Sequence, residues 1–411
     1  MTDTIERSGA SGSKGLKAGA LGLVATTVIA VASTAPGYSL AAGIGGINEA
    51  VSLKAPFIML FAFVPMGCIA AAFFYMNKAD ADCGTTFAWA TRAFGPSAGW
   101  LGSWGLIVAD LLIMPNLAGV SGQYLLLLFG MEDAAANAVY VTILGSLFII
   151  AMCWICWKGI ELSARTQVAL LSTELAILSV FAVVAITRAF GGVTKTVDGV
   201  TYESVTPSLS WLTPGGLSTS AITAGLVIAV FAYWGWDTAV SVNEECEDSN
   251  RTPGVAAVLS VFILLAIYLL MAFGTQAFLG PEFVVANSDD AIYAVGKEAL
   301  GGFFNSLLII AILTSAAASC QTTILPATRS MLSMGAHEAG PSVLSRIDPR
   351  TLTPKWSTWF FGAVSVGWFI LLVVISENSD TDAYGASIAA VGLAIAFYYG
   401  LTGYACVWYY R

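Results

Sequence analysis

The chain has 411 residues, of which 57% are hydrophobic and only 10% are charged, a composition that excludes a soluble globular protein. Its formal net charge of −9 comes largely from carboxylates between the apolar segments, so it does not indicate a nucleic-acid partner. One histidine and seven scattered cysteines argue against histidine-based catalysis and against a metal site. We therefore expect an all-α integral membrane protein that is not an enzyme and needs no cofactor.

Ten apolar segments follow one another along the chain. A transmembrane helix needs about 20 apolar residues, and the segments predict ten such helices. Before the first lies a polar tail, residues 1–17, and after the fifth lies a long polar loop, residues 190–219, with a short surface helix expected near Trp211. The approximate ranges of the segments are 20–46, 56–77, 98–129, 137–157, 164–189, 220–243, 254–279, 302–334, 357–376 and 383–410.

The basic residues predict the orientation of these helices. Lysine and arginine collect on the cytoplasmic side of membrane proteins. With ten crossings and a cytoplasmic N-terminus, thirteen of the 17 basic residues lie on the cytoplasmic side. The other four are Lys54, Arg188, Lys195 and Lys297. We expect a multi-pass plasma-membrane protein with both termini in the cytoplasm and with the loop 190–219 outside the cell.

The first apolar segment is interrupted at mid-length by Ser33-Thr-Ala-Pro-Gly-Tyr-Ser39. Pro36 cannot donate a backbone hydrogen bond, and Gly37 tolerates non-helical backbone angles. We therefore expect a discontinuous helix, whose second half begins within this stretch. The candidate substrate-binding residues here are Ala35, Pro36, Gly37, Tyr38 and Ser39.

The sixth segment is interrupted in the same way. Its apolar run, residues 221–232, is too short to cross a membrane and meets Tyr233-Trp-Gly-Trp-Asp237. Backbone leaves a helix inside a membrane only where protein or a water-filled cavity surrounds it. Gly235 would let a substrate approach the backbone closely. The candidate substrate-binding residues here are Phe231, Ala232, Tyr233, Trp234, Gly235 and Trp236.

The two interruptions occupy equivalent places in two sets of five helices. Because five is odd, the second set enters the membrane from the opposite face, so the repeats, residues 18–189 and 220–411, are predicted to be inverted. Short, interrupted segments at corresponding positions are typical of secondary transporters whose site lies at the repeat interface. The start of a half-helix offers free N–H groups that suit a carboxylate, and the end of another offers carbonyls that suit an ammonium group. Together they match an α-amino acid.

The sixth segment also resembles a known family. Phe231-Ala-Tyr-Trp-Gly-Trp-Asp237, followed by Glu244-Glu245 and Arg251-Thr-Pro253, is similar to the sixth helix of amino acid/polyamine/organocation (APC) permeases. The resemblance implies an inverted-repeat transporter of the LeuT type that moves its substrate by alternating access. Trp234 and Trp236 flank Gly235 beside the interruption and could form an aromatic wall or a thin gate. The alternative is that they serve packing or lie at the membrane interface.

Further stretches extend the resemblance over essentially the whole chain. They are Gly84-Thr-Thr-Phe-Ala-Trp-Ala-Thr-Arg-Ala-Phe-Gly95, Ser163-Ala-Arg165, Thr314-Ser315 and Arg329-Ser-Met331. One departure is Thr34-Ala-Pro-Gly-Tyr38, where the family has G-S-G-I-F, and this blurs the match at the expected carboxylate site. Relatives usually have twelve helices, against the ten segments here, so we leave open whether two more follow.

Three carboxylates fall within apolar segments, namely Asp110, Glu174 and Asp237. Each is costly in hydrocarbon and needs a partner, a cavity, water or a proton. Asp237 follows the interruption and is expected to cap the second half of the sixth helix, with substrate contact as the alternative. For Asp110 we weigh structural pairing, including access to the cytoplasmic vestibule, against a role in coupling. Glu244 and Glu245 are expected in a solvated cytoplasmic loop, where they pair with nearby arginines.

Glu174 lies where some relatives place a lysine that stands in for sodium, so here the charge is reversed. Beside Thr314 and Ser315 it could take a proton or help to hold a cation, or it could only fix helix packing. We predict a proton-coupled permease for an amino acid or a related organic amine, with sodium as the alternative coupling ion. The rival interpretations are a polyamine transporter, an amino acid exchanger and, more distantly, a channel.

Overall fold

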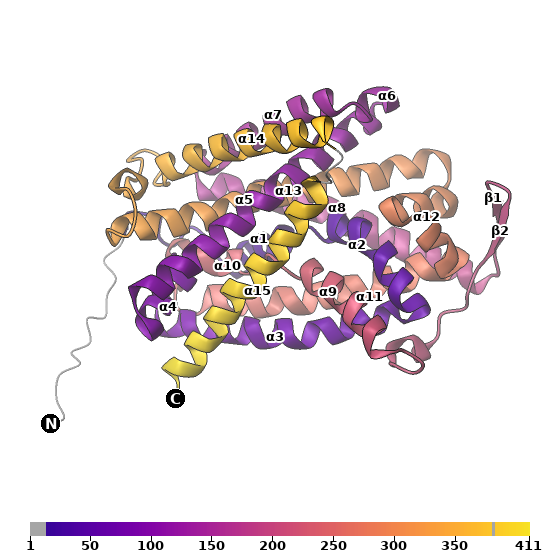
Figure 1. The fold of residues 1–411 in the computed structure, drawn as a ribbon, viewed down its shortest axis with the longest axis horizontal. Helices are drawn as coiled ribbons and strands as arrows, with labels where there is room; N and C mark the ends of the chain where they lie inside the picture. The colour runs from indigo at the N-terminus through magenta and orange to yellow at the C-terminus, as the bar shows by residue number, and fades with distance from the viewer. Residues whose placement is uncertain (1–13, 380–382) are drawn as a thin grey trace.

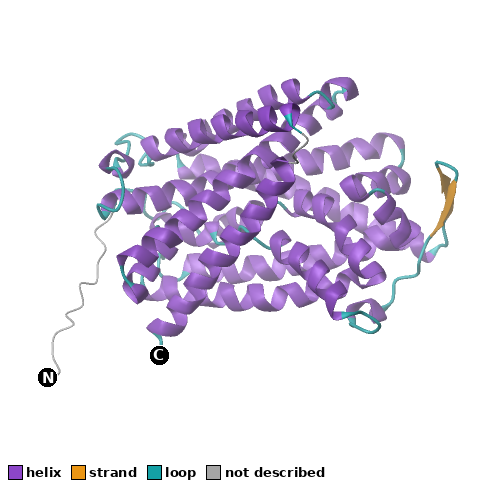
Figure 2. Ribbon diagram, in the orientation of Figure 1, coloured by secondary structure: helices purple, strands orange, loops and turns teal. Residues whose placement is uncertain are grey.

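The computed structural model describes residues 14–379 and 383–411. In this part of the chain nearly every element is a helix, and the exception is one short two-stranded ribbon (Figure 2). The first described residues and the C-terminal Arg411 lie at the same end of the helical bundle, and the ribbon lies at the opposite end (Figure 1). Two termini at one end are what an even number of crossings produces.

The elements up to the ribbon form the first group. In chain order they are α1 (Leu23–Ser33), α2 (Pro36–Val51), η1 (Ser52–Lys54), α3 (Ala55–Ala79), α4 (Thr86–Phe94), α5 (Pro96–Leu128), α6 (Glu132–Ala135), α7 (Ala138–Lys158) and α8 (Ile160–Phe190). The ribbon consists of β1 (Thr194–Val197) and β2 (Val200–Glu203), which pair antiparallel with Thr194 opposite Glu203. No feature of the sequence predicted this hairpin.

The second group follows the ribbon. It consists of η2 (Leu209–Leu212), α9 (Thr219–Ala232), α10 (Thr238–Ser241), η3 (Asn243–Glu245), α11 (Thr252–Ala286), η4 (Ser288–Asp290), α12 (Ala291–Leu300), α13 (Gly302–Ala336), η5 (Ser342–Ser345), α14 (Lys355–Asn378) and α15 (Ala383–Tyr409). A short helix does contain Trp211, as predicted, but its indole is buried and stacks on Phe273 rather than lying at the surface.

Eight helical stretches in the described chain are long and apolar enough to cross a membrane. In this count α1, α2 and α3 form one run of 57 residues, and α9, with 14 residues, is too short to be counted. Each of the ten predicted segments nevertheless coincides with a helix or a pair of short helices. The all-helical fold is confirmed, whereas the exact number of crossings stays a prediction.

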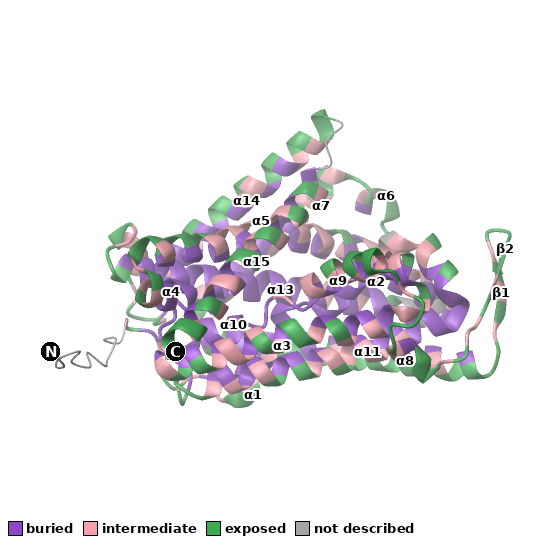
Figure 3. Cartoon of the chain, turned by 60° about the horizontal axis from the view of Figure 1, so that its bottom comes forward, coloured by how far each residue is buried: buried purple, intermediate pink, exposed green. Residues whose placement is uncertain are grey.

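The interior of the bundle is organised around α13. In its most apolar stretch 78% of the residues are buried, a larger share than in any other of these eight spans. It packs against α5, α8 and α7, and also against the short helices α1, α2 and α10. Burial is concentrated on the inner faces of the helices, and exposed residues cover their outer faces (Figure 3). Three of the short helices that begin or end inside the bundle, α1, α2 and α10, are therefore close to α13.

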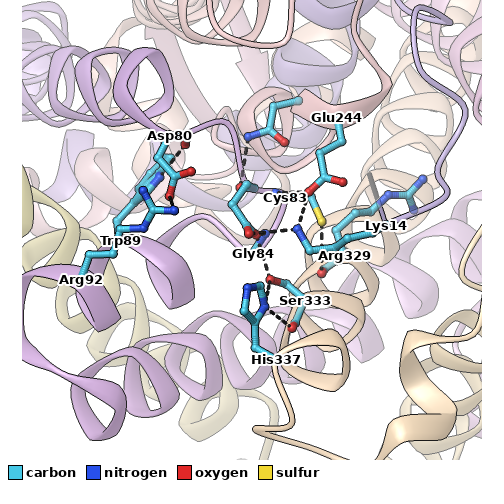
Figure 4. Close-up of polar contacts among 12 residues, drawn as sticks. Lys14, Asp80, Cys83, Gly84, Trp89, Arg92, Glu244, Arg329, Ser333 and His337 are labelled. Carbon is cyan, nitrogen blue, oxygen red and sulfur yellow. Dashed lines mark hydrogen bonds and ion pairs between the residues drawn. The ribbon is translucent and has the colours of Figure 1, made fainter. Parts of the chain in front are cut away.

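The start of the described chain is anchored by Lys14, Asp82 and Glu244, which we name the Lys14 cluster. The Lys14 ammonium lies 2.9 Å from Asp82 and 2.5 Å from Glu244, and its side chain is only 5% exposed. Figure 4 shows the contact of Lys14 with Glu244. Burial raises the pKa of Asp82, but the Lys14 ammonium together with hydrogen bonds from Gly84 and Ser333 outweighs this effect and holds the pKa below its ordinary value. The cluster therefore keeps its opposite charges at neutral pH.

A second, fully buried ion pair lies next to this cluster. The Arg329 guanidinium donates to both carboxylate oxygens of Glu245 at 2.9–3.0 Å, and neither side chain is exposed. The backbone carbonyl of Glu245 also accepts hydrogen bonds from the N–H groups of Ala20 and Leu21. The expectation that Glu245 lies in a solvated loop was wrong, because Arg329 from α13 supplies a charge partner that is distant in sequence.

We expect Lys14→Met to release the N-terminal segment. Removing one partner of a buried ion pair leaves the other charge uncompensated, at a cost of about 3 kcal/mol. The variant should melt at a lower temperature in detergent and should be cut faster by a protease ahead of α1. The matched control is Lys17→Met, because Lys17 pairs with Glu161 in an exposed contact that contributes little. Equal cleavage rates for the two variants would contradict this role of Lys14.

Candidate functional site

The first predicted interruption is a real break between two helices. α1 ends at Ser33 and α2 begins at Pro36, so Thr34 and Ala35 form the link, which we call the first break. Ala35 has a φ of 45°, in the left-handed region that few residues other than glycine adopt. Proline at the first position of α2 suits a helix start because its missing N–H needs no partner there.

The N-terminus of α2 is already occupied by side chains of this protein. The Gly37 N–H donates to Glu174 Oε1 at 2.7 Å, and the Tyr38 N–H donates to the hydroxyl of Ser315 at 3.1 Å. The expectation that these N–H groups are free for a substrate carboxylate was therefore wrong in this structure. A carboxylate does lie at the helix start, as the positive potential there favours, but it belongs to α8.

The neighbours of Glu174 differ in part from those predicted. Ser315 lies beside it. A Cβ atom built on Gly37 would be 3.3 Å from Glu174 Oε1 and 3.4 Å from Ser315 Cβ. The hydroxyl of Thr314 instead donates to carbonyls of its own helix, so Thr314 does not join this group. Glu174 also faces the start of α2, not the carbonyls that end α1. Its second oxygen, Oε2, is buried and has no hydrogen-bond partner.

The second predicted interruption separates α9, which ends at Ala232, from α10, which begins at Thr238. We call residues 233–237 the second break. Gly235 has a φ of 117°, and a Cβ atom placed on it would lie 2.7 Å from the carbonyl oxygen of Ser33. The two breaks are thus in direct backbone contact. The space beside Gly235 holds the first break and is not open to a substrate here.

Asp237, the last residue of the second break, was expected to cap α10. It occupies the N-cap position, but its side chain makes no capping hydrogen bond. Its two carboxylate oxygens instead accept hydrogen bonds from the hydroxyls of Tyr398 and Tyr399 at 3.1 and 2.9 Å. Tyr398 also accepts a hydrogen bond from the Trp234 indole at 2.6 Å. The capping interpretation was wrong, because the donors to Asp237 come from α15, which is too distant in the sequence for this contact to be predicted.

Asp110 lies near the middle of α5 and is 4% exposed, so it does not reach an open vestibule. Its Oδ2 atom is buried and has no hydrogen-bond partner. Asp110 and Asp237 line the same cavity of about 10 Å³, room for about one water molecule. The other lining residues come from the end of α1, the second break, α10 and α13; they are Ser33, Trp234, Gly235, Thr238, Thr323 and Pro326. The cavity therefore lies where the end of α1 meets the second break.

Two aromatic residues of the second break serve packing in this structure. Tyr233 is buried against Tyr268, with ring centroids 4.9 Å apart. Trp236 is also fully buried, between Phe73 and Tyr399. Of the two tryptophans, only Trp234 lines the cavity.

Four residues that the sequence did not single out complete the site. The Ser319 hydroxyl donates to the carbonyl of Ser33 at 2.9 Å, and the Tyr268 hydroxyl donates to the carbonyl of Ala232 at 2.5 Å. With Tyr398 and Tyr399 they hold the ends of the broken helices. A hydroxyl on an apolar helix is a weak signal, and no spacing in the sequence connects these positions to the breaks.

A larger cavity, of about 750 Å³, lies away from the breaks, between α4, α5 and the loop after α13. Its wall includes Phe87, Trp100 and Leu101. Asp82, Cys83 and Glu244 offer a close group of possible metal ligands near it. Lys14 pairs with both carboxylates of that group, and burial raises the pKa of the Cys83 thiol. The Lys14 ammonium therefore already pairs with the two carboxylates that a metal cation would bind.

The family model described as amino acid permease matches residues 21–411, nearly the whole chain. The chain belongs to the amino acid permease family. This is a family of multi-pass membrane transporters and not of enzymes, and the resemblance drawn from the sixth segment is confirmed.

Curated relatives of the permease are distant. A vacuolar cationic amino acid transporter 4 of Arabidopsis thaliana is 24% identical, over 76% of this chain and 52% of the relative. The branched-chain amino acid permease BcaP of Bacillus subtilis is 22% identical, over 86% and 75%. An arginine/ornithine antiporter of Latilactobacillus sakei is 23% identical, over 90% and 76%. The permease spans little more than half the length of the first of these.

A solved structure supports the fold independently of sequence. The crystal structure of MhsT in complex with L-phenylalanine matches with a TM-score of 0.58 at 15% identity, covering 92% of the permease and 87% of MhsT. At this identity the likeness establishes the fold alone. MhsT is a transporter of the LeuT fold, so the permease has that fold.

We expect Gly235→Ala to disturb the contact between the breaks. The new Cβ atom meets the Ser33 carbonyl, and the positive φ is unfavourable for alanine, at a cost of about 1–3 kcal/mol. The melting temperature in detergent should fall. Gly367→Ala on α14 is the control, because no atom lies within 4 Å of its new Cβ and alanine favours a helix. A Gly235→Ala protein as stable as this control would show that the breaks separate freely.

Proposed function

We propose that the permease is a proton-coupled secondary active transporter that moves an amino acid or a related organic amine by alternating access. The observation that carries this proposal is the contact of two helix breaks inside the bundle, with a buried carboxylate on the N-terminus of α2. Broken helices that meet at the centre of an inverted-repeat fold are typical of substrate sites in secondary transporters. The substrate-facing residues would be those at the two breaks.

In the proposed transporter the chain consists of two inverted repeats, residues 18–189 and 220–411. Support comes from the equivalent places of the two breaks, one in each repeat, and from the LeuT-fold likeness. The excess of basic residues at the end that holds both termini favours a cytoplasmic location for that end, in the plasma membrane. A cavity of about 10 Å³ between the breaks is too small for an amino acid, so the site must open to load its substrate.

Glu174 is the proposed coupling residue, since it joins α8 to α2 beside α13. When ionised, its charge is stabilised by the N-terminus of α2. Protonation removes that charge and weakens the hold on Gly37, which would free α2 to move relative to α8. Its unpartnered Oε2 atom is available to receive the proton. Asp110 and Asp237 are the next candidates.

The cargo class is supported by relatives. Proteins named as a cationic amino acid transporter, a branched-chain amino acid permease and an arginine/ornithine antiporter all match over most of the chain. Exchange is the alternative mode of transport, and sodium held between Glu174 and Ser315 is the alternative coupling ion. Both alternatives predict transport that does not follow a pH gradient.

We expect Glu174→Gln to uncouple transport from protons. Glutamine resembles the protonated acid in shape and charge, so the variant should retain counterflow exchange in liposomes. It should lose accumulation driven by a pH gradient, because no group changes its charge during the cycle. Uptake with and without an imposed pH gradient, and with and without a sodium gradient, measures both properties.

The control variant is Glu161→Gln, which lies on the same helix but pairs with Lys17 at the surface. It should accumulate substrate like the unaltered permease. Glu174→Gln that also accumulates substrate with unchanged pH dependence would contradict the coupling role and leave Glu174 a packing residue. Accumulation that follows the sodium gradient would replace the proton by sodium.

A further inference from the structure

Three carboxylates lie inside the helical bundle without a cationic partner. Asp110, Glu174 and Asp237 are each 4% exposed or less. In the part of the chain that the structure describes, six ion pairs are formed, and none includes any of these three residues. Buried charges in membrane proteins are normally paired or serve function. Each of these three carboxyl groups therefore needs either a bound proton or a cation from outside the described chain.

The same site has little to offer a substrate carboxylate. The α2 N–H groups that would bind it are taken by Glu174 and Ser315. A free carboxylate entering here would have to displace Glu174 from the Gly37 N–H and Ser315 from the Tyr38 N–H. The occupied helix start therefore disfavours a zwitterion docked by its carboxylate.

The cavity that Asp110 and Asp237 share is suited to a compact cation. The Oδ2 atom of Asp110 is buried and lacks a partner, and two tyrosine hydroxyls hold the Asp237 carboxylate in place. A carboxylate accepts about four hydrogen bonds, so Asp237 retains acceptor capacity beyond these two. The cavity's room for about one water molecule matches the size of a primary ammonium group, which donates three hydrogen bonds.

Other groups around the cavity favour the same ligand. Ser33, Thr238 and Thr323 also line the cavity. The hydroxyls of Ser33 and Thr238 hydrogen-bond to each other at 2.8 Å, and a hydroxyl oxygen has two lone pairs, so each keeps capacity to accept from an ammonium group. Trp234 also lines the cavity, and an indole face attracts a nearby cation. Acidic, hydroxyl and aromatic groups are thus combined at one point between the two breaks.

We propose that the permease carries an organic cation whose primary ammonium group binds between Asp110 and Asp237, and that the α2 N-terminus does not bind a substrate carboxylate. This inference rests on the proposed transport function and selects its cargo, an alkyl amine or diamine instead of a neutral amino acid. The breaks would separate to admit the alkyl chain, while the ammonium group occupies the cavity already present.

The test uses lysine and two ligands that each lack one of its groups. Lysine has both a carboxylate and a second amine, cadaverine is lysine without its carboxylate, and norleucine is lysine without its second amine. Binding to the purified full chain in detergent, at fixed pH and ionic strength, is measured by calorimetry and thermal shift. We expect cadaverine to bind at least as tightly as lysine, and norleucine to bind at least about tenfold more weakly.

Asp110→Asn is the decisive variant. It is nearly isosteric, and the Oδ2 atom that it alters has no partner to lose, so the fold should be retained. Cadaverine affinity should fall by about tenfold or more, because a charge-assisted contact is removed. Asp290→Asn is the control, because Asp290 also accepts a hydrogen bond from a tyrosine hydroxyl, that of Tyr124, but lies outside the cavity. The cadaverine affinity of this variant should be unchanged.

Several outcomes would overturn the inference. Tight norleucine binding with no response to cadaverine would assign the site to a zwitterion. Cadaverine binding that Asp110→Asn leaves unchanged would place the amine elsewhere. A thermal shift with sodium or potassium chloride alone, together with none from cadaverine or methylammonium, would assign the cavity to an inorganic ion.

Liposome uptake separates this inference from the transport proposal. Saturable norleucine uptake driven by a pH gradient would keep the proposed function and overturn the cationic cargo. Cadaverine that binds at Asp110 but is not carried across would keep the site and overturn the transport function. Saturable cadaverine uptake that Asp110→Asn lowers supports both.

Discussion

Backbone groups at the two helix breaks impose the constraint on which this structure depends. A helix that stops inside a bilayer leaves N–H and C=O groups with no water to bind, and each unsatisfied group costs several kcal/mol. Here side chains from other helices supply the partners. Glu174 and Ser315 accept from the start of α2, and Ser319 and Tyr268 donate to the ends of α1 and α9.

These partners explain why α13 lies at the centre of the bundle. Ser315 and Ser319 are one helical turn apart, so they lie on one face of α13. One of them satisfies the first residues of α2, and the other satisfies the last residue of α1. A single helix thus bridges the first break, and α8 and α11 both pack against α1 as well. If α1 moved relative to α2, these contacts would have to be exchanged, which ties any opening of the site to α13.

The sequence predicts the breaks well because their signals are local. A proline and a glycine inside an apolar run, or a glycine between tryptophans, interrupt a helix whatever surrounds them. The same local logic failed for the partners. Asp237 was expected to cap the next helix, because the nearest donors in sequence are the N–H groups of α10. Tyr398 and Tyr399 took that place from more than 160 residues away, and no periodicity indicates which face of α15 meets the break. Glu245 was misplaced for the same reason, since Arg329 is a tertiary partner.

The position of Glu174 has a consequence for competition at the site. A carboxylate attached to α8 and held 2.7 Å from the Gly37 N–H is an intramolecular ligand. Tethered groups act at effective concentrations on the order of millimolar or higher. A dissolved carboxylate at micromolar concentration would seldom displace it, however well its own shape fitted. The start of α2 is therefore an anion-binding site that the protein's own Glu174 already occupies. Any molecule that binds there can do so only after Glu174 has moved away from the Gly37 N–H, or by displacing it.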